Sequence, residues 1–171
     1  RGIVVIMKIL VFSDSHSSLY FMRMCIEQIK PDTVIHLGDH YDDGTAIAEE
    51  NPNVRFFQVP GNCDGFRMLS WQPEVISCSV YGVRMFMTHG HKQSVKSGTH
   101  RLLLDARKSK AEIVLYGHTH AAECRMEEDG LWVLNPGACG TYGGSVGLIE
   151  TENGSITGCR ILTYDDLEVL L

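Results

Sequence analysis

The chain has 171 residues, with 15 Lys or Arg against 21 Asp or Glu, and its formal net charge is therefore −6. Hydrophobic residues make up 44% of it and charged residues 21%, which excludes a disordered protein and is typical of a globular one. The negative charge argues against broad, sequence-independent binding to nucleic acid, which needs a basic surface. No apolar run is long enough to span a bilayer. We expect one domain over residues 1–171.

The cysteines and the start of the chain indicate a cytoplasmic protein. None of the six cysteines is in a C-x-x-C pair, so neither a structural zinc site nor a thioredoxin motif is indicated. The first residues do not resemble a secretory signal, and we therefore expect reduced thiols and a cytoplasmic location. The run Met7–Leu10 resembles a natural start, which leaves residues 1–6 as a cloning remnant or an alternative upstream start.

The first half of the chain alternates apolar strands with helices. The predicted elements are a strand at Ile9–Phe12, a helix over Leu19–Ile29 capped by Ser17 or Ser18 and ended before Pro31, a strand at Thr33–Leu37, a short helix near Thr45–Glu50 and a strand at Val54–Val59. This βαβαβ order predicts a parallel sheet with helices on its faces.

The second half is richer in hairpins. Its predicted elements are a hairpin of Val75–Val80 and Val83–Thr88, a helix over Gly98–Lys108, a strand at Ile113–Tyr116, and hairpins of Glu123–Met126 with Leu131–Leu134 and of Ser145–Glu150 with Ser155–Leu162. We therefore expect an α/β protein in which two mixed sheets pack face to face with helices outside, a four-layer α/β/β/α sandwich.

Polar motifs collect directly after the predicted strands. They are Asp14-x-His16, Gly38-Asp39, Gly61-Asn62, His89-Gly90-His91 and His118-x-His120. Ligands of open α/β sheets bind outside the carboxyl ends of the strands, so these side chains are expected to meet at one edge. Each motif alone is a weak signal, but coincidence does not explain all of them together. Nitrogen and oxygen ligands suit Mn, Fe, Zn or Co, and their number suits two ions about 3.5–4 Å apart with a bridging carboxylate.

This order of motifs resembles the calcineurin-like metallophosphoesterase superfamily, and the short chain with Gly61-Asn62-Cys63-Asp64 resembles its YfcE-like phosphodiesterase branch. The resemblance covers Met7 to about Leu162. It implies a metallo-dependent phosphatase-like fold and a phosphodiesterase that uses two divalent ions, foremost Mn²⁺, with Fe, Zn, Co or Ni as alternatives.

The resemblance also implies the roles of the site residues. Asp14, His16 and His120 would hold the first ion, Asn62, His89 and His118 the second, and Asp39 would bridge them. A hydroxide shared by both ions would attack the phosphorus atom, because two dications lower the pKa of a shared water and neutralise charge on the phosphoryl oxygens.

One position departs from the family pattern. Many members carry a His after Gly-Asn that is thought to protonate the leaving group, and here that position is Cys63. Since imidazolium is the better acid near neutral pH, we expect a preference for esters with acidic leaving groups, such as aryl phosphodiesters. Asp64 is expected to orient a neighbouring His, and His91 to hydrogen-bond beside the ligands, with substrate contact or proton donation as its alternatives.

Other polar residues receive simpler interpretations. Asp42 and Asp43 are similar to the second acid of a G-D-x-x-D motif, with Asp42 at the matching spacing and loop capping as the alternative. His40 either reaches the cleft or faces solvent. His36 is expected to be a core residue with one hydrogen bond, and His100 to be solvated. Asn135-Pro136-Gly137 resembles a turn that supports the site.

Alternatives to a small-molecule phosphodiesterase stay open. They are a phosphomonoesterase or nucleotide hydrolase, a nuclease, and a non-catalytic scaffold, because the same fold occurs in a protein-binding subunit of the retromer coat. Specificity would come from loops at Tyr41–Thr45, Phe66–Trp71 and Lys92–His100. Four cations in or beside these loops are candidates to meet phosphate, with a solvated role as the default: Arg67, Lys92, Lys96 and Arg101. A homodimer is common in similar proteins, although nothing in the sequence marks an interface.

Overall fold

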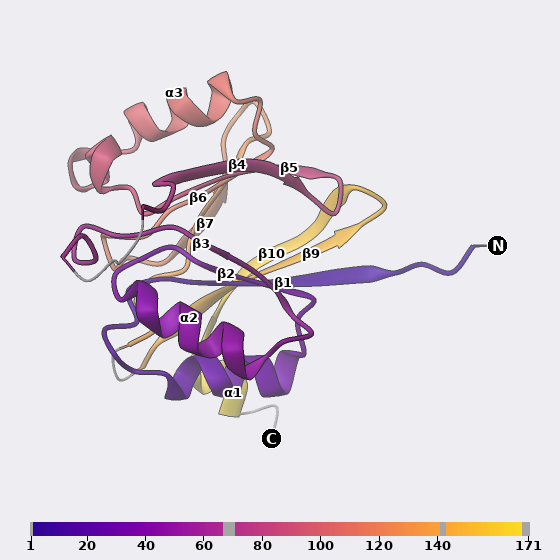
Figure 1. The fold of residues 1–171 in the computed structure, drawn as a ribbon. Coiled ribbons are helices and arrows are strands. Elements are labelled where there is room, and N and C mark those ends of the chain that lie inside the picture. Colours follow the sequence, from indigo (N-terminus) through magenta and orange to yellow (C-terminus); the bar gives the residue numbers. More distant parts are fainter. Residues whose placement is uncertain (1, 67–70, 141–142, 169–171) are drawn as a thin grey trace.

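The computed structural model describes residues 2–66, 71–140 and 143–168 (Figure 1). In chain order its strands and helices are β1 (Ile6–Phe12), α1 (Tyr20–Ile29), β2 (Thr33–His36), α2 (Tyr41–Glu50), β3 (Arg55–Gln58), β4 (Val75–Val80), β5 (Val83–Thr88), α3 (His100–Lys108), β6 (Ile113–Leu115), β7 (Glu123–Met126), β8 (Trp132–Asn135), β9 (Ser145–Glu152), β10 (Ser155–Thr163) and α4 (Tyr164–Glu168). Two short 3₁₀ turns, His91–Gln93 and Val95–Ser97, connect β5 to α3.

The strands form two mixed sheets of five strands each. The first sheet has the order β10-β9-β1-β2-β3, and the second has the order β4-β5-β6-β8-β7. β1, β2 and β3 run parallel, as do β5, β6 and β8, while the hairpins add antiparallel strands. The parallel core and the hairpin edges agree with the predicted elements.

The sheets pack face to face, and helices cover their outer faces (Figure 1). Side chains from both sheets fill the space between them, among them Val11, Ile35, Met85 and Leu115. Helices α1 and α4 pack on the outside of the first sheet, with Ile47 of α2 in the same cluster. Helix α3 covers the second sheet. This is the predicted four-layer α/β/β/α sandwich.

The helices differ from the predictions at three places. Helix α2 begins at Tyr41, so the predicted loop Tyr41–Thr45 is its first turn. Helix α1 follows Leu19 without a side-chain cap, and the predicted capping by Ser17 or Ser18 is wrong. Helix α4 was not predicted, although Asp166 accepts hydrogen bonds from the backbone N–H and the hydroxyl of Thr163, a local capping signal.

The predicted motifs follow β1, β2, β3, β5 and β6, at the carboxyl ends of these strands. Parallel pairing brings the motif loops of each sheet together. Contacts of His89 with Leu37 and of His118 with Asp14 join the two sets of loops at one edge of the sandwich. None of the helices in the described part of the chain has the length and apolar character needed to cross a bilayer.

Candidate metal centre

Asp39, His89 and His118 form a buried group that we call the inner ligand group. Their ligand atoms all lie within 4.8 Å of one another. His89 Nε2 lies 3.2 Å from His118 Nδ1 and 3.6 Å from Asp39 Oδ2. The His89 side chain is fully buried and that of Asp39 is 5% exposed. The group therefore combines residues from the loops that follow β2, β5 and β6, and so from both sheets.

The tautomer of His89 makes this group suited to a cation. His89 Nδ1 lies 2.8 Å from the carbonyl oxygen of Leu37. Nδ1 must carry the proton that this contact needs, because a carbonyl only accepts. The lone pair of Nε2 then faces the centre, where Asn62 Oδ1 lies 3.1 Å away. In the neutral imidazole, Nε2 of His89 and the oxygens of Asn62 and Asp39 all present lone pairs to the same space. A divalent cation would stabilise this arrangement, so the donor set fits the predicted metal.

Asp14, His16 and His120 form the outer ligand group, whose ligand atoms also lie within 4.8 Å of one another. Asp14 is fully buried, and its Oδ1 lies 3.1 Å from Nε2 of His120, whose side chain is 47% exposed. Its Oδ2 accepts hydrogen bonds from Ser13 Oγ at 2.6 Å and from the backbone N–H of His118 at 3.2 Å. The last bond places the outer group directly beside the inner one.

The backbone at this edge is unusual. Five of the predicted ligands have left-handed conformations: Asp14 (φ 56°), His16 (46°), Asp39 (58°), His118 (70°) and His120 (62°). Such conformations cost non-glycine residues about 1 kcal/mol each and cluster at functional sites. All five residues lie in the loops that follow β1, β2 and β6.

Two glycines of the motifs are needed for close approach between loops. A Cβ atom on Gly61 would lie 2.1 Å from Asp39 Oδ1, and one on Gly117 would lie 2.1 Å from Ser13 Oγ. Both distances are far below van der Waals contact, so any larger residue would displace the carboxylate or the hydroxyl that supports one. The close packing of the loops therefore requires glycine at both positions.

Asp64 has a different role from the predicted one. Its buried carboxylate orients no histidine among the described residues. Oδ2 accepts the backbone N–H groups of Gly61 and Asp39 at 2.7 and 3.0 Å, and Oδ1 accepts those of His40 and Tyr41 at 2.8 and 2.9 Å. A carboxylate thus caps the amino-terminal turn of α2 from another loop, and in doing so it fixes the backbone of Asp39.

A second network holds the loop of the outer group. The Gly38 N–H donates to His36 Nδ1, and His36 Nε2 then donates to Ser15 Oγ at 2.9 Å. Ser15 Oγ donates to Asp43 Oδ2 at 2.7 Å. His36 is thus a core histidine, as predicted, with two hydrogen bonds rather than one. Burial lowers its pKa to about 4, which keeps it neutral.

The second acid that supports the site is Asp43. The backbone N–H of Ser17 also donates to Asp43 Oδ2, at 2.8 Å. Asp42, which has the expected motif spacing, is exposed on the first turn of α2. The preference for Asp42 is therefore wrong by one residue, because the rotation of the helix decides which acid faces Ser15.

Asp39 is held ionised by its surroundings. Burial alone would raise its pKa, but the backbone N–H of Cys63, which donates to Oδ1 at 2.9 Å, and the nearby His89 together leave that pKa below its usual value. The pKa of His118 is lowered mainly by burial and to a smaller extent by the nearby His89. A carboxylate beside neutral imidazoles is the protonation state that binds metal.

Cys63 and His91 lie at the border of the inner group. Cys63 is exposed, and burial together with the charge of Asp39 raises the pKa of its thiol. The ring of His91 lies 5.4 Å from that of His89 and 6.2 Å from that of His118. Its Nδ1 is buried with no hydrogen-bond partner in the described part of the chain, and the hydrogen bond predicted for His91 stays a prediction.

Further predicted residues lie near the site. His40 Nδ1 lies 3.0 Å from Ser17 Oγ, and its ring meets the ring of His16 edge-on at 5.3 Å, so it lies beside the outer ligand group. Asn135 Nδ2 donates to Thr119 Oγ1 at 2.9 Å, which supports the loop between His118 and His120 as expected. The contribution of Ser13 and Ser15 was missed, although both flank Asp14 in its motif.

The remaining candidates are less closely involved. His100 and Arg101 are exposed on α3, and Lys92 pairs with Glu74 at 3.8 Å. Lys96 lies near enough to His118 for its charge to contribute to the lowered pKa. Arg67, and with it the centre of the predicted Phe66–Trp71 loop, lies outside the described residues.

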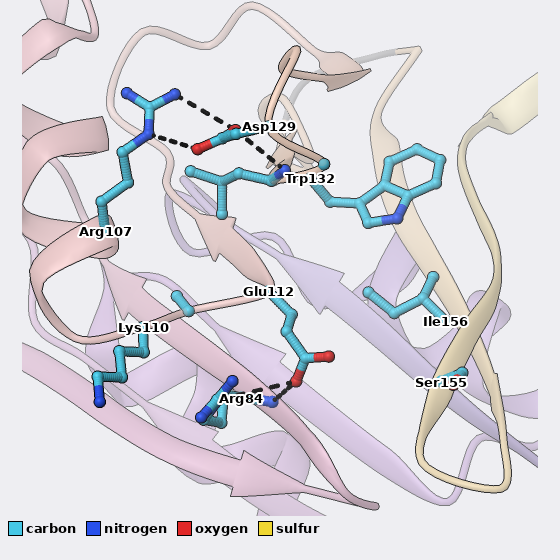
Figure 2. A pocket seen from close by; sticks show the side chains of 11 residues that line it. Arg84, Arg107, Lys110, Glu112, Asp129, Trp132, Ser155 and Ile156 are labelled. Atoms are coloured by element: carbon cyan, nitrogen blue, oxygen red, sulfur yellow. Dashed lines mark hydrogen bonds and ion pairs between the residues drawn. The ribbon is translucent and has the colours of Figure 1, made fainter.

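A surface cavity of about 630 Å³ lies elsewhere (Figure 2). Its lining includes Arg84 near the start of β5, Glu112 just before β6 and Trp132 at the start of β8, at the opposite ends of the strands from the ligand groups. Arg107 pairs with Asp129 at 2.9 Å on its rim. No predicted ligand lines it, so it is separate from the candidate metal centre.

The sequence is similar to those of known phosphoesterases. Residues 7–154 match the model of the calcineurin-like phosphoesterase superfamily domain. The chain is 34% identical over 164 residues to Phosphodiesterase MJ0936 of Methanocaldococcus jannaschii, covering 85% of this chain and 94% of that one.

Solved structures share the fold. One is a conserved uncharacterized protein of Streptococcus pneumoniae described as a predicted phosphoesterase, with TM-score 0.75, 24% identity and coverage of 94% of this chain and 91% of that one. Another is Vps29 of Entamoeba histolytica complexed with Zn²⁺, with TM-score 0.64, 19% identity and coverage of 92% and 99%. At these identities the two structures show the fold alone.

Proposed function

Because the chain belongs to the calcineurin-like phosphoesterase superfamily, we propose that it is a dinuclear metal-dependent phosphodiesterase that acts on small-molecule phosphodiesters. The observation that carries the proposal is the contact between the inner and outer ligand groups. Two groups of side chains that could hold a metal ion, with members from both sheets, share one edge. The relative named as a phosphodiesterase, which is similar along nearly its whole length, supports the diester as substrate.

The proposed roles of the site residues are those that the resemblance implies. Asp14, His16 and His120 would hold one ion, and Asn62, His89 and His118 would hold the other, with Asp39 as the bridge. Two bound dications supply a water of lowered pKa and a positive field for the phosphoryl oxygens. The chain supplies the orientation of the ligands, because Leu37 fixes the His89 tautomer and Asp64 fixes the backbone of Asp39.

The charge of the site favours a phosphate once the cations are present. Imidazole ligands are neutral, so two dications outweigh the carboxylates of Asp14 and Asp39. A local positive field then attracts an anion to a chain whose net charge is −6. Manganese as the resident ion, a homodimer and a cytoplasmic location stay predictions.

The direct test is hydrolysis of bis(p-nitrophenyl) phosphate by the purified chain. We expect activity that chelator abolishes and that Mn²⁺ restores. His100→Ala serves as the matched control, because His100 is exposed on α3 and belongs to neither ligand group. Folded protein without hydrolysis under Mn²⁺, Fe²⁺, Zn²⁺, Co²⁺ or Ni²⁺ would contradict the proposal.

Cys63 sets the preference for leaving groups. It is exposed, and its backbone N–H donates to Asp39, so a side chain at this position lies beside the proposed bridge. We expect aryl phosphodiesters to be hydrolysed faster than alkyl esters or monoesters. We also expect Cys63→His to raise kcat for alkyl leaving groups by about 100-fold, the lower end of the range of general acid catalysis. The ratio of kcat values for aryl and alkyl diesters measures this, and an unchanged ratio would contradict it.

The alternative is a non-catalytic scaffold, which the fold-level similarity to Vps29 keeps open. Metal content alone does not separate the two functions, because a Vps29 structure is itself described as complexed with Zn²⁺. Hydrolysis separates them. A scaffold would bind metal and stay inactive on aryl and cyclic phosphodiesters, dinucleotides and monoesters alike.

A further inference from the structure

Two cysteines meet between the sheets, away from the candidate metal centre. The thiol of Cys124 on β7 lies 3.0 Å from the sulfur of Cys159 on β10, 35 positions later in the chain. β7 is an edge strand of the second sheet and β10 is an edge strand of the first. The contact therefore joins the two halves of the sandwich.

The sequence of β10 directs Cys159 into this contact. A register shift between Ile156 and Gly158 marks a bulge in the pairing of β10 with β9. Side chains of a regular strand alternate between faces, so residues three apart would point to opposite sides. The extra residue changes which face each later side chain points to, and Ile156, Cys159 and Ile161 all pack against the core between the sheets.

Cys124 reaches the same core from the other side. Both Cys124 and Trp132 pack against that core from the second sheet. Trp132 and Ile156 also line the cavity in Figure 2, where the β9–β10 hairpin faces the second sheet. Neither cysteine is fully buried, so a small oxidant can reach the pair.

We propose that Cys124 and Cys159 are an oxidation site, at which a hydroperoxide converts the two thiols into a disulfide that ties the two sheets together. One thiolate attacks an oxygen of hydrogen peroxide and breaks the O–O bond, which gives a sulfenic acid and one water. The second thiol attacks the sulfenic sulfur, forms the S–S bond and expels the second water. The sulfurs lose two electrons in total, and the peroxide gains them.

The geometry requires little movement. A disulfide holds its sulfurs about 2.05 Å apart, so the two atoms need to approach by about 1 Å. The pKa of the Cys159 thiol is raised mainly by burial and to a smaller extent by the contact with Cys124. Because the thiolate is the reactive form, oxidation is slow near neutral pH and accelerates as the pH rises.

The link matters for the edge that carries the ligands. β7 follows directly after the loop that holds His118 and His120, and β10 belongs to the sheet that supplies Asp14 and Asp39. A bond between these strands opposes separation of the two sheets, and so preserves the alignment of the ligand groups. It also closes a chain loop that constrains the unfolded state.

Peptide mapping tests the bond itself. The full-length protein is treated with hydrogen peroxide, alkylated without reductant and digested with trypsin and then with a protease that cuts after glutamate. The second cut falls at Glu150 and Glu152 and separates Cys139 from Cys159. We expect a linked pair of peptides that carry Cys124 and Cys159 and that dithiothreitol releases. Alkylated Cys124 and Cys159 after peroxide treatment would overturn the proposal.

Thermal unfolding of the chelator-treated protein tests the effect of the bond without reference to activity. From the loop length and the usual sensitivity of Tm in a domain of this size, oxidation should raise Tm by roughly 8–15 °C, reversibly. Cys124→Ala and Cys159→Ala should abolish the rise. Cys78→Ala, which removes a partly buried thiol on β4, should retain it. A disulfide that forms without a rise in Tm would refute the stabilising role, whatever the outcome of the hydrolysis assay.

Discussion

The inner and outer ligand groups contain the same types of side chain but differ in burial and support. In the inner group His89 is fully buried and its tautomer is fixed by the Leu37 carbonyl. In the outer group Asp14 is equally buried, but the His120 side chain is 47% exposed and His16 is exposed as well. A buried, hydrogen-bonded imidazole loses little freedom when it binds metal, whereas an exposed one must be ordered. We therefore expect the inner group to bind its ion more tightly and the outer group to exchange its ion.

The largest effect should come from removal of the inner imidazole. His89→Ala takes away the atom around which Asn62 Oδ1, Asp39 Oδ2 and His118 Nδ1 converge. We expect kcat/KM for an aryl phosphodiester to fall about 1,000-fold, because charge stabilisation by a catalytic metal contributes several kcal/mol. Millimolar Mn²⁺ should not restore it. A loss below 10-fold would show that the inner group is not catalytic.

Loss of Asp64 should be the largest effect on stability. Asp64→Ala leaves the backbone N–H groups of Gly61, Asp39, His40 and Tyr41 without their acceptor. We expect the free energy of unfolding to fall by about 3–4 kcal/mol, since hydrogen bonds to charged groups are strong and buried donors are costly to leave unpaired. Asp42→Ala, at an exposed acid on α2, should change it by less than about 0.5 kcal/mol. Chemical denaturation measures both, and equal effects would contradict the role of Asp64.

The support of the outer group should be sensitive to acid. His36 has an ordinary pKa of 6.5 in the unfolded chain and one of about 4 when buried. Between these values the unfolded state binds the proton and the folded state does not, so stability falls as the pH drops and the loss is complete below pH 4. The shift corresponds to about 3 kcal/mol. Denaturation of the metal-free protein should show this loss between pH 7 and pH 4, and His36→Gln should flatten the curve. Parallel curves for the two proteins would contradict it.

The smallest of these effects should be the loss of an exposed outer imidazole. His120→Ala is expected to weaken the binding of one ion about 10-fold to 30-fold, no more than the loss of a residue that only orients a ligand, because solvent water can take the place of this exposed side chain. Activity should fall at micromolar Mn²⁺ and recover at millimolar Mn²⁺. His100→Ala is the control for a changed surface histidine. Failure to recover at high Mn²⁺ would show that the two groups do not differ as proposed.

The parts of the fold and site that depend on residues close together in the sequence could be predicted from it. Each motif follows its own strand, and parallel strands bring their ends together, so Asp14 and Asp39 were placed at one edge correctly. Helix α2 was predicted to start too late because its cap, Asp64, lies in a loop 23 residues beyond Tyr41. No pattern within the helix reports such a distant acceptor.

Two other details depend on how helix α2 is rotated about its axis and on which face of β10 each side chain points to. The spacing of residues in the sequence does not determine either. Asp43 rather than Asp42 faces Ser15 because of how the first turn of α2 is oriented. Cys159 meets Cys124 only because a bulge changes the phase of β10. Helix α4, by contrast, carried a readable signal in Thr163 and Asp166.

The most direct test of the metal centre is anomalous X-ray scattering from crystals of the Mn²⁺-loaded protein. We expect two manganese peaks about 3.5–4 Å apart, one at the outer ligand group and one at the inner, with the carboxylate of Asp39 in contact with both. The inner peak should have the higher occupancy when Mn²⁺ is limiting. A single peak at saturating Mn²⁺, or peaks remote from His89 and Asp14, would contradict the dinuclear site.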